Sequence, residues 1–491
     1  MRCELFFGRI CHRSLVGQRS ETDALEPKRA NCRLPMTVCT LGLQSICFGA
    51  QAGKLPPPDD SPKTNRPMSL RSLIKRTLGP FIRLSAPHPR SLSPALWGLS
   101  LTPKGTLSLG PHDLEALAVR YGTPLHVLDA SRLRSNIEAL GGLDLFYSYK
   151  TNPVPAILKR LHDLGAGAEV ISEMELDLAL RLGVPAGRII YNGPAKSGRS
   201  LRTAISQRIL LLNLNHREEL ARVVAISREL GLRVRLGIRV NCSSGWSAQF
   251  GTPIAGGAAL SLFEEAFSIP DIELAGLHSH RGELIHNAQA LDDFLNEVLA
   301  FADTLYARLS WSPEILDLGG SLAIPTVQPM SSWDIRRSQT FGVEVGGPDV
   351  NAQLAVGEYA AAIRSKVAEH YRRAGRKAPH MVVELGRAVT GNAQLLMTRV
   401  VTTRAAADSP AMAVVDAGIS LASIMRHERH QIFMANRPVT DRLQPYRLVG
   451  PLCQPGDVIS NSVRLPELHS GDLLAIMDSG AYFESDSTVF S

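Results

Sequence analysis

The residue that first points to chemistry is a lysine at the end of an apolar run. In the stretch FYSYKTNPVP, residues 146–155, Lys150 follows aromatic and small residues typical of a buried strand, and Asn152-Pro153 then ends the run. A lysine in such a place is costly unless it is neutralised, paired or used covalently. The other interpretation is a lysine just beyond the strand end, with its amine in water. This stretch alone leaves both open.

Three further segments place polar residues or glycines at the ends of strand-like runs. They are HSHRG (278–282), LDLGGS (316–321) and ELGR (384–387). Each is ordinary alone: a hydrogen-bonded histidine, a tight turn, a surface ion pair. Together, glycine amides and an arginine suit a phosphate, an acid suits a ring nitrogen, an imidazole stacks on a ring, and a lysine amine forms an imine. The set predicts a pyridoxal-phosphate site, whose desolvated lysine we expect to have a lowered pKa.

The elements that must position these residues alternate regularly. Eight β-rich runs, each followed by a helical pattern, lie at residues 145–150, 166–172, 188–193, 208–215, 233–241, 273–280, 314–320 and 380–387. Eight such units over roughly 250 residues predict a (β/α)8 barrel and disfavour the competing doubly wound open sheet. Barrel enzymes gather their chemistry at the carboxyl ends of the strands, where all four segments fall. The longest irregular stretch, about 325–356, is expected to be a mobile loop near the site.

The helical alternation stops after the eighth unit. Short strands between Pro- and Gly-rich turns predict a mainly β domain over residues 394–491, which the strand-like residues 123–130 are expected to join. The barrel then spans residues 131–393. Residues 1–105 show little periodicity and leave two interpretations open, a disordered extension or a wrongly assigned start near Met68.

Charge and cysteine content narrow the function classes. The net charge of the 491 residues is +7, but residues 1–100 hold 15 Lys/Arg and 6 Asp/Glu, which leaves 38 basic and 40 acidic residues beyond. The folded part is therefore near neutral, which argues against nucleic-acid binding, and no apolar run is long enough to span a membrane. Five of the seven cysteines lie in the first fifty residues, in no zinc spacing. We expect a reducing, cytoplasmic location.

From about residue 123 to 483 the chain resembles the group IV, fold type III pyridoxal-phosphate decarboxylases, which include diaminopimelate, ornithine and arginine decarboxylases. The resemblance implies an alanine-racemase-like barrel and decarboxylation of a small-molecule amino acid through a Schiff base on Lys150. It places His280 on the ring and Glu384 at the pyridine nitrogen. The cofactor-binding residues that it implies are Lys150, Ser172, Glu175, His280, Gly282, Gly319, Gly320, Glu384, Gly386, Arg387 and Tyr482.

Two C-terminal segments extend the resemblance. GPLCQPGD (450–457) is similar to the family's Gly-Pro-x-Cys segment, and SGAYFES (479–485) to its Gly-Ala-Tyr. They imply that Cys453 returns a proton after carbon dioxide leaves and that Tyr482 reaches the phosphate. In the family both arrive from the partner subunit, which implies a homodimer with shared sites. The inert alternative for Cys453 is a buried thiol.

The match departs from the family at several positions. Glu283 stands where a serine usually contacts the phosphate, and a carboxylate there repels a phosphate. Gln454 replaces an acid that binds the substrate's distal amine, which favours a neutral or acidic distal end. Arg426 is a candidate for the substrate carboxylate, with a surface basic cluster as the alternative. The chain also ends at Ser491, shortly after Tyr482, so we expect a truncated β domain.

Three other functions remain as alternatives. A metal-dependent barrel hydrolase would use the His278-Ser-His280 pair, but the strand ends offer no further His and Asp ligands, so we expect no metal. An alanine-racemase-like enzyme would share the barrel and its lysine, but the chain lacks a segment like that family's tyrosine base. A non-catalytic regulatory paralogue that binds pyridoxal phosphate is opposed by the retention of Lys150, Glu384 and Cys453.

Overall fold

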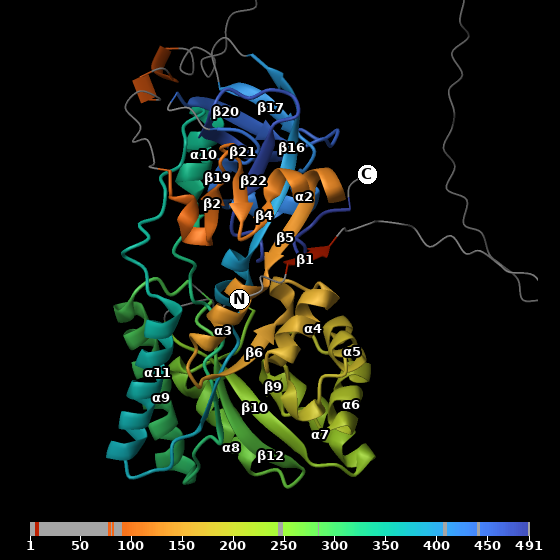
Figure 1. The fold of residues 1–491 in the computed structure, drawn as a ribbon. Helices are drawn as coiled ribbons and strands as arrows, with labels where there is room; N and C mark the ends of the chain where they lie inside the picture. The colour runs from red at the N-terminus through yellow and green to blue at the C-terminus, as the bar shows by residue number, and fades with distance from the viewer. Residues whose placement is uncertain are drawn as a thin grey trace, which may run out of the picture. The chain divides into compact units, whose positions relative to one another are not determined.

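The fold is described from a computed structural model of the chain (Figure 1). The described residues are 5–8, 77–79, 81–82, 91–243, 249–282, 284–405, 410–438 and 442–489. Most of the segment 1–90, with the alternative start at Met68, lies outside this set, and so does Glu283. Among the described residues, no helix combines the length and apolar content needed to cross a membrane.

Within the described residues, eight parallel strands form a closed barrel. The strands are β6 (Asp144–Ser148), β7 (Gly167–Val170), β8 (Ile189–Tyr191), β9 (Leu211–Leu214), β10 (Val234–Asn241), β12 (Ile272–Ser279), β13 (Ile315–Asp317) and β15 (His380–Val383). The ring closes because β15 pairs with β6, with Val382 opposite Asp144. This closure confirms the predicted (β/α)8 barrel and excludes the open sheet.

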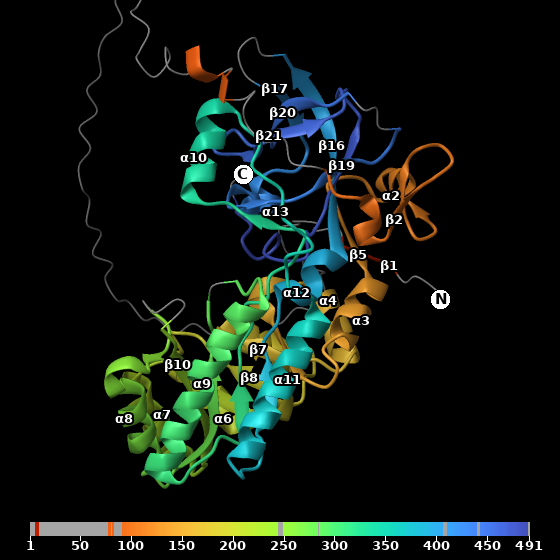
Figure 2. The ribbon, with the colours of Figure 1, turned by 90° about the vertical axis from the view of Figure 1, so that its left-hand side faces the viewer.

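Helices on the outside of the barrel bury one apolar stripe each. They are α4 (Pro155–Asp163), α5 (Glu173–Arg181), α6 (Gly198–Gln207), α7 (Arg217–Leu230), α8 (Ala258–Phe267), α9 (Ala288–Leu309) and α11 (Val356–Arg373). In α9 the buried residues recur at helical spacing, as at Leu291, Leu295 and Val298. Helices α9 and α11 lie side by side (Figure 2). The main core fills the space between strands and helices, and a smaller apolar cluster around Phe146 and Leu211 fills the barrel interior.

The second part of the fold is mainly β. Its sheet has the order β1 (Leu5–Gly8), β5 (Leu125–Asp129), β16 (Gln394–Arg404), β17 (Ala411–Val415), β20 (Gln444–Val449) and β21 (Val458–Leu465), with β22 (Leu473–Ile476) joining β16 to β19 (Ile432–Met434). Strand β5, before the barrel in sequence, pairs antiparallel with β16. A small sheet of β2 (Leu99–Leu101), β3 (Leu107–Leu109) and β4 (His112–Asp113) leads into α2 (Leu114–Tyr121). Folded structure therefore begins before residue 105, earlier than the boundary expected.

The stretch expected to be a loop contains ordered elements. Strand β14 (Gln328–Pro329) pairs with β18 (Glu428–Arg429) of the β part, and α10 (Ser332–Phe341) follows it. A capping box between Ser331 and Asp334 starts this helix, and Ser338 is its one buried residue. Because the segment has so little apolar periodicity, that cap is its main helical signal. The loop prediction was wrong for this stretch, which contacts β21.

Candidate active site

A cavity of about 500 Å³ lies at the carboxyl ends of the barrel strands. Strand ends supply most of its wall, and Ile424, Glu428 and Tyr482 come from the β part. Of the residues predicted from sequence, the lining includes Lys150, His280, Gly282, Gly320, Glu384, Gly386, Arg387 and Tyr482. Residues more than three hundred positions apart therefore converge on one cavity, as the strand-end argument requires.

Lys150 lies in a short 3-10 turn, Tyr149–Thr151, directly after β6. Its Nζ donates to Ser148 Oγ at 2.7 Å and to Glu169 Oε2 at 3.0 Å. The lysine side chain is 35% exposed, whereas that of Glu169 is 1% exposed. Loss of solvent alone would lower the pKa of Lys150, but the charges of Glu169 and other acidic groups outweigh it and raise that pKa above its ordinary value. The expected lowered pKa was therefore wrong, because the sequence did not reveal this partner.

Glu384 directly follows β15 and lies inside a cluster of polar side chains. Asn192 Nδ2 donates to its Oε1 at 2.5 Å, and His278 Nε2 lies 3.5 Å from its Oε2. Burial, followed by the neighbouring carboxylates of Asp317 and Glu169, raises the pKa of Glu384 well above its ordinary value. Burial likewise raises the pKa of Asp317 to about 6. The two acids therefore compete for one proton.

The glycine loop after β13 is tightly packed against His280. The Gly320 amide donates to His280 Nδ1 at 3.0 Å, and Ser321 Oγ lies 3.2 Å from His280 Nε2. The Gly319 amide donates to Asp317 Oδ1 at 3.0 Å. Both amides that we expected to hold a phosphate thus have protein partners. Gly320 is required for space, because a Cβ there would lie 2.7 Å from the carbonyl oxygen of Glu384.

Arg387 opens the short helix α12 (Arg387–Thr390) beside Tyr482. Its Nη1 and Nη2 donate to the two carboxylate oxygens of Glu428 at 2.7 and 2.6 Å. The guanidinium also lies 5.1 Å from the centre of the Tyr482 ring. The Tyr482 amide donates to the Thr151 carbonyl at 2.8 Å. Tyr482 therefore enters the cavity of its own chain, and its expected arrival from a partner subunit is wrong.

Six predicted site residues do not line this cavity, and Gly319, already described, is one of them. Ser172 caps α5 by accepting from the Glu175 amide at 3.2 Å, and Glu175 accepts from the Ile171 amide at 2.7 Å. Burial raises the pKa of Glu175 to about 7. This pair therefore holds the β7–α5 turn.

Cys453 and Gln454 are both exposed and are absent from the described lining. Their loop is held by buried Asp457, which accepts from the amides of Ile419 and Leu452, each at 2.7 Å.

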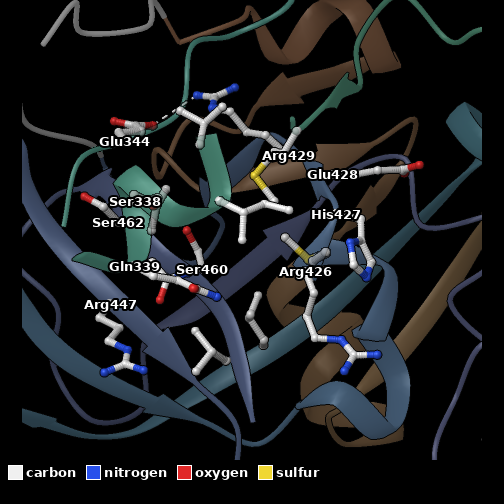
Figure 3. Close-up of a pocket in the computed structure, with 18 of the residues that line it drawn as sticks. Ser338, Gln339, Glu344, Arg426, His427, Glu428, Arg429, Arg447, Ser460 and Ser462 are labelled. Atoms are coloured by element: carbon white, nitrogen blue, oxygen red, sulfur yellow. Dashed lines mark hydrogen bonds and ion pairs between the residues drawn. The ribbon is translucent and has the colours of Figure 1, made fainter. Parts of the chain in front are cut away.

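Arg426 lines a different cavity, of about 450 Å³, between α10 and strands β20 and β21. Figure 3 shows it on the opposite side of that cavity from Arg447. Its Nε donates to the Ser423 carbonyl at 3.1 Å. Arg426 and Lys150 are thus in separate cavities of the chain.

Four functional side chains were missed from the sequence: Glu169, Asn192, Arg239 and Glu428. Glu169 is the one charged residue of β7, and Arg239 is one of two arginines in β10; a charge within a largely apolar strand was the available signal. Asn192 follows β8 and Glu428 lies on β18, with no local pattern that marks either.

The donor set fits pyridoxal phosphate. It provides an amine, an acid for a ring nitrogen, an imidazole beside the cavity, and an arginine and a tyrosine at one end. A metal fits less well. Ligand atoms of His278, Asp317 and Glu384 lie within 4.8 Å of one another, but His280 is turned to Gly320 and Ser321. The two histidines therefore do not converge on one site, as the hydrolase alternative required.

Comparison with known proteins agrees with this donor set. Residues 130–391 match the family model "Pyridoxal-dependent decarboxylase, pyridoxal binding domain". A diaminopimelate decarboxylase of Methanothermobacter thermautotrophicus is 28% identical over 412 residues, covering 80% of this chain and 90% of the relative. One of Pseudomonas fluorescens is 29% identical, covering 75% and 85%. The crystal structure of AQ1208 from Aquifex aeolicus has a TM-score of 0.67 at 27% identity, covering 80% and 89%.

Proposed function

The chain belongs to the pyridoxal-dependent decarboxylase family, and we propose that it decarboxylates an amino acid with the cofactor held at Lys150. The observation that carries the proposal is the convergence of Lys150, Glu384, His280, Arg387 and Tyr482 on one cavity. The relatives that it resembles carry the name diaminopimelate decarboxylase, which supports the reaction class.

The side chains divide the chemical tasks among them. When bound, pyridoxal phosphate supplies a ring that accepts the electron pair left behind as carbon dioxide departs. Lys150 Nζ would be the amine that bonds the cofactor, and Glu169, 3.0 Å away, accepts a hydrogen bond from that amine and orients it. Glu384 would hold a proton at the ring nitrogen. Arg387 and Tyr482 would hold the phosphate, and His280 would contact the ring.

The substrate that we propose has a neutral or acidic distal end. Gln454 offers a neutral amide where the family resemblance places an acid for a distal ammonium. An amide binds a carboxylate, an amide or a hydroxyl without leaving a buried charge unpaired. A conjugated or acidic amino acid therefore fits better than lysine, ornithine or diaminopimelate.

A homodimer would complete the site. Cys453 and Gln454 are exposed and lie outside the described lining of their own chain's cavity. If Cys453 returns the proton to the substrate carbon, a second copy has to present it. Tyr482, by contrast, is already in place within one chain.

The visible spectrum tests the cofactor assignment. Protein supplied with pyridoxal phosphate should show a band that borohydride removes, and Lys150→Ala should lack that band. The matched control is Lys159→Ala, because Lys159 is an exposed lysine on α4 paired with Asp163. A screen for carbon dioxide release, weighted toward acidic and conjugated amino acids, then tests the substrate class. A band without turnover on any amino acid would favour the regulatory paralogue.

Mixed subunits test the shared site. Lys150→Ala and Cys453→Ala are each expected to be inactive, but a hybrid dimer holds one intact site if Cys453 acts across the interface. Random mixing should then restore about a quarter of the wild-type rate, since half of the dimers are hybrids with one working site in two. Hybrid formation is verified by size and by a different affinity tag on each variant. If activity does not recover in verified hybrids, Cys453 acts in the site of its own chain.

A further inference from the structure

Asn192 joins two acids that line the cofactor cavity. It follows β8, is 4% exposed, and lines the cavity. Its Nδ2 lies 2.9 Å from Glu169 Oε1 and 2.5 Å from Glu384 Oε1. Glu169 is the partner of Lys150, and Glu384 is the acid expected at the ring nitrogen. One amide group therefore donates to the acid at the amine and to the acid at the ring.

A second asparagine fixes the orientation of this amide. Asn213 on β9 is 2% exposed, and its Nδ2 donates to Asn192 Oδ1 at 2.8 Å. That contact assigns the oxygen of Asn192 to Asn213, so the NH2 group is turned toward the two carboxylates. Both of its hydrogens are then used on acids, as ionised acceptors require.

The two acids have different neighbours. Glu384 faces Asp317 and His278, whereas Glu169 faces Lys150 and Ser148, which favour its ionised form as Asn192 does. The charged and titratable groups that act on one or both acids are Lys150, Arg239, Glu175, His278 and Asp317. Burial beside Asp317 favours protonated Glu384, whereas a donor amide favours the ionised carboxylate.

We propose that Asn192 is a positioning residue that donates to Glu169 and Glu384 together and so opposes the protonation of both, which orients one carboxylate toward Lys150 and the other toward the ring nitrogen. The proposal rests on the proposed function, because it assigns these two acids to the cofactor. It gives the chain a direct link between the protonation state at the amine and that at the ring.

Two variants of Asn192 test this role. Asn192→Asp is nearly isosteric but replaces the donor group with a third carboxylate, and Asn192→Ala removes the amide. The control is Asn136→Ala, because Asn136 is a buried asparagine on α3 (Ala130–Glu138) that donates to the Val389 carbonyl and to Asn392 Oδ1. The three are compared with wild type as cofactor-loaded and as cofactor-free protein.

In loaded protein without substrate, the readout is the pH dependence of the visible band. We expect its midpoint to move by about one pH unit or more in both Asn192 variants, and kcat to fall at least about tenfold with KM nearly unchanged. Asn136→Ala should keep the wild-type midpoint. A wild-type titration curve in Asn192→Ala, from protein that is folded and loaded, would overturn the proposal.

In cofactor-free protein, the readout is the free energy of unfolding against pH. Loss of the donors raises the folded-state pKa of both acids, so the stability lost relative to wild type should be largest at high pH and shrink as the pH falls. A loss that does not change with pH, as expected for Asn136→Ala, would assign Asn192 a packing role only. This arm needs no cofactor, so it separates failure of this inference from failure of the proposed function. Asn213→Ala serves as the second variant if Asn192→Asp does not fold.

Discussion

The buried pair of Arg387 and Glu428 gives the sharpest quantitative test. Their side chains are 11% and 9% exposed, and two hydrogen bonds of 2.7 and 2.6 Å join them. Burial alone would raise the pKa of Glu428, but the hydrogen bond from His430 and the charge of Arg387 outweigh it and set the pKa at about 2. A fall from 4.5 to about 2, at about 1.4 kcal/mol per unit, corresponds to about 3 kcal/mol of stability.

The substitution is Glu428→Gln, which keeps the size and removes the charge. The carboxylate is ionised in both folded and unfolded chains above pH 4.5, so its full contribution is present there and is lost as the pH falls toward 2. We therefore expect Glu428→Gln to cost about 3 kcal/mol at pH 7, in the range for one partner removed from a buried pair. The difference from wild type should narrow below pH 4.5.

Urea unfolding of the cofactor-free protein at several pH values measures this difference. Added pyridoxal phosphate provides a second comparison, because a phosphate can replace Glu428 as the partner of Arg387. The cofactor should then stabilise Glu428→Gln more than wild type. Glu344→Gln is the control, since Glu344 pairs with Arg429 outside the cofactor cavity. An equal loss at pH 7 and pH 3.5, or no extra stabilisation by the cofactor, would refute the reasoning.

Three further predictions follow from the same cavity. In Gly386→Ala the new Cβ would lie 1.8 Å from Thr151 Oγ1, so thermal unfolding should show a lower midpoint and absorbance should show weaker cofactor retention. Asp317 has a pKa raised from 3.8 to about 6, so wild type should lose stability as the pH rises from 4 to 6. Asp317→Asn removes this acid and should reduce that loss in urea titrations. Tyr482→Phe should weaken cofactor affinity, measured by equilibrium dialysis, and should keep the borohydride-sensitive band at saturating cofactor. An unchanged affinity would show that the Tyr482 hydroxyl does not bind the phosphate.

The barrel was predictable because its signal repeats. Each strand is a short apolar run and each helix that follows has one buried stripe, and eight repetitions admit few arrangements. The strand-end residues were predictable for the same reason, since parallel strands in a barrel deliver their carboxyl ends to one face. By contrast, α10 has a single buried residue, Ser338, and a helix without an apolar stripe leaves only its cap in the sequence.

Partners of buried charges were not predictable, because they come from distant segments. Glu428 reaches Arg387 across 41 residues, and Tyr482 bonds Thr151 from the other end of the chain. The local sequence around each of these residues does not indicate which distant segment supplies its partner. The sequence could show that a lysine or an arginine would have to be paired, but the identity of the partner depends on how two domains meet.

That distinction explains why the state of Lys150 was predicted in the wrong direction. Desolvation was inferred from the apolar run before it, and desolvation does act to lower its pKa. The deciding influence is Glu169, a carboxylate within the neighbouring strand, held by Ser148 and Asn192 as well as by the lysine. Lys150 is thus held as an ammonium by the carboxylate beside it. A lysine at a strand end therefore implies a carboxylate on the adjacent strand as much as it implies a lowered pKa, and the charged residue within β7 was the place to look for it.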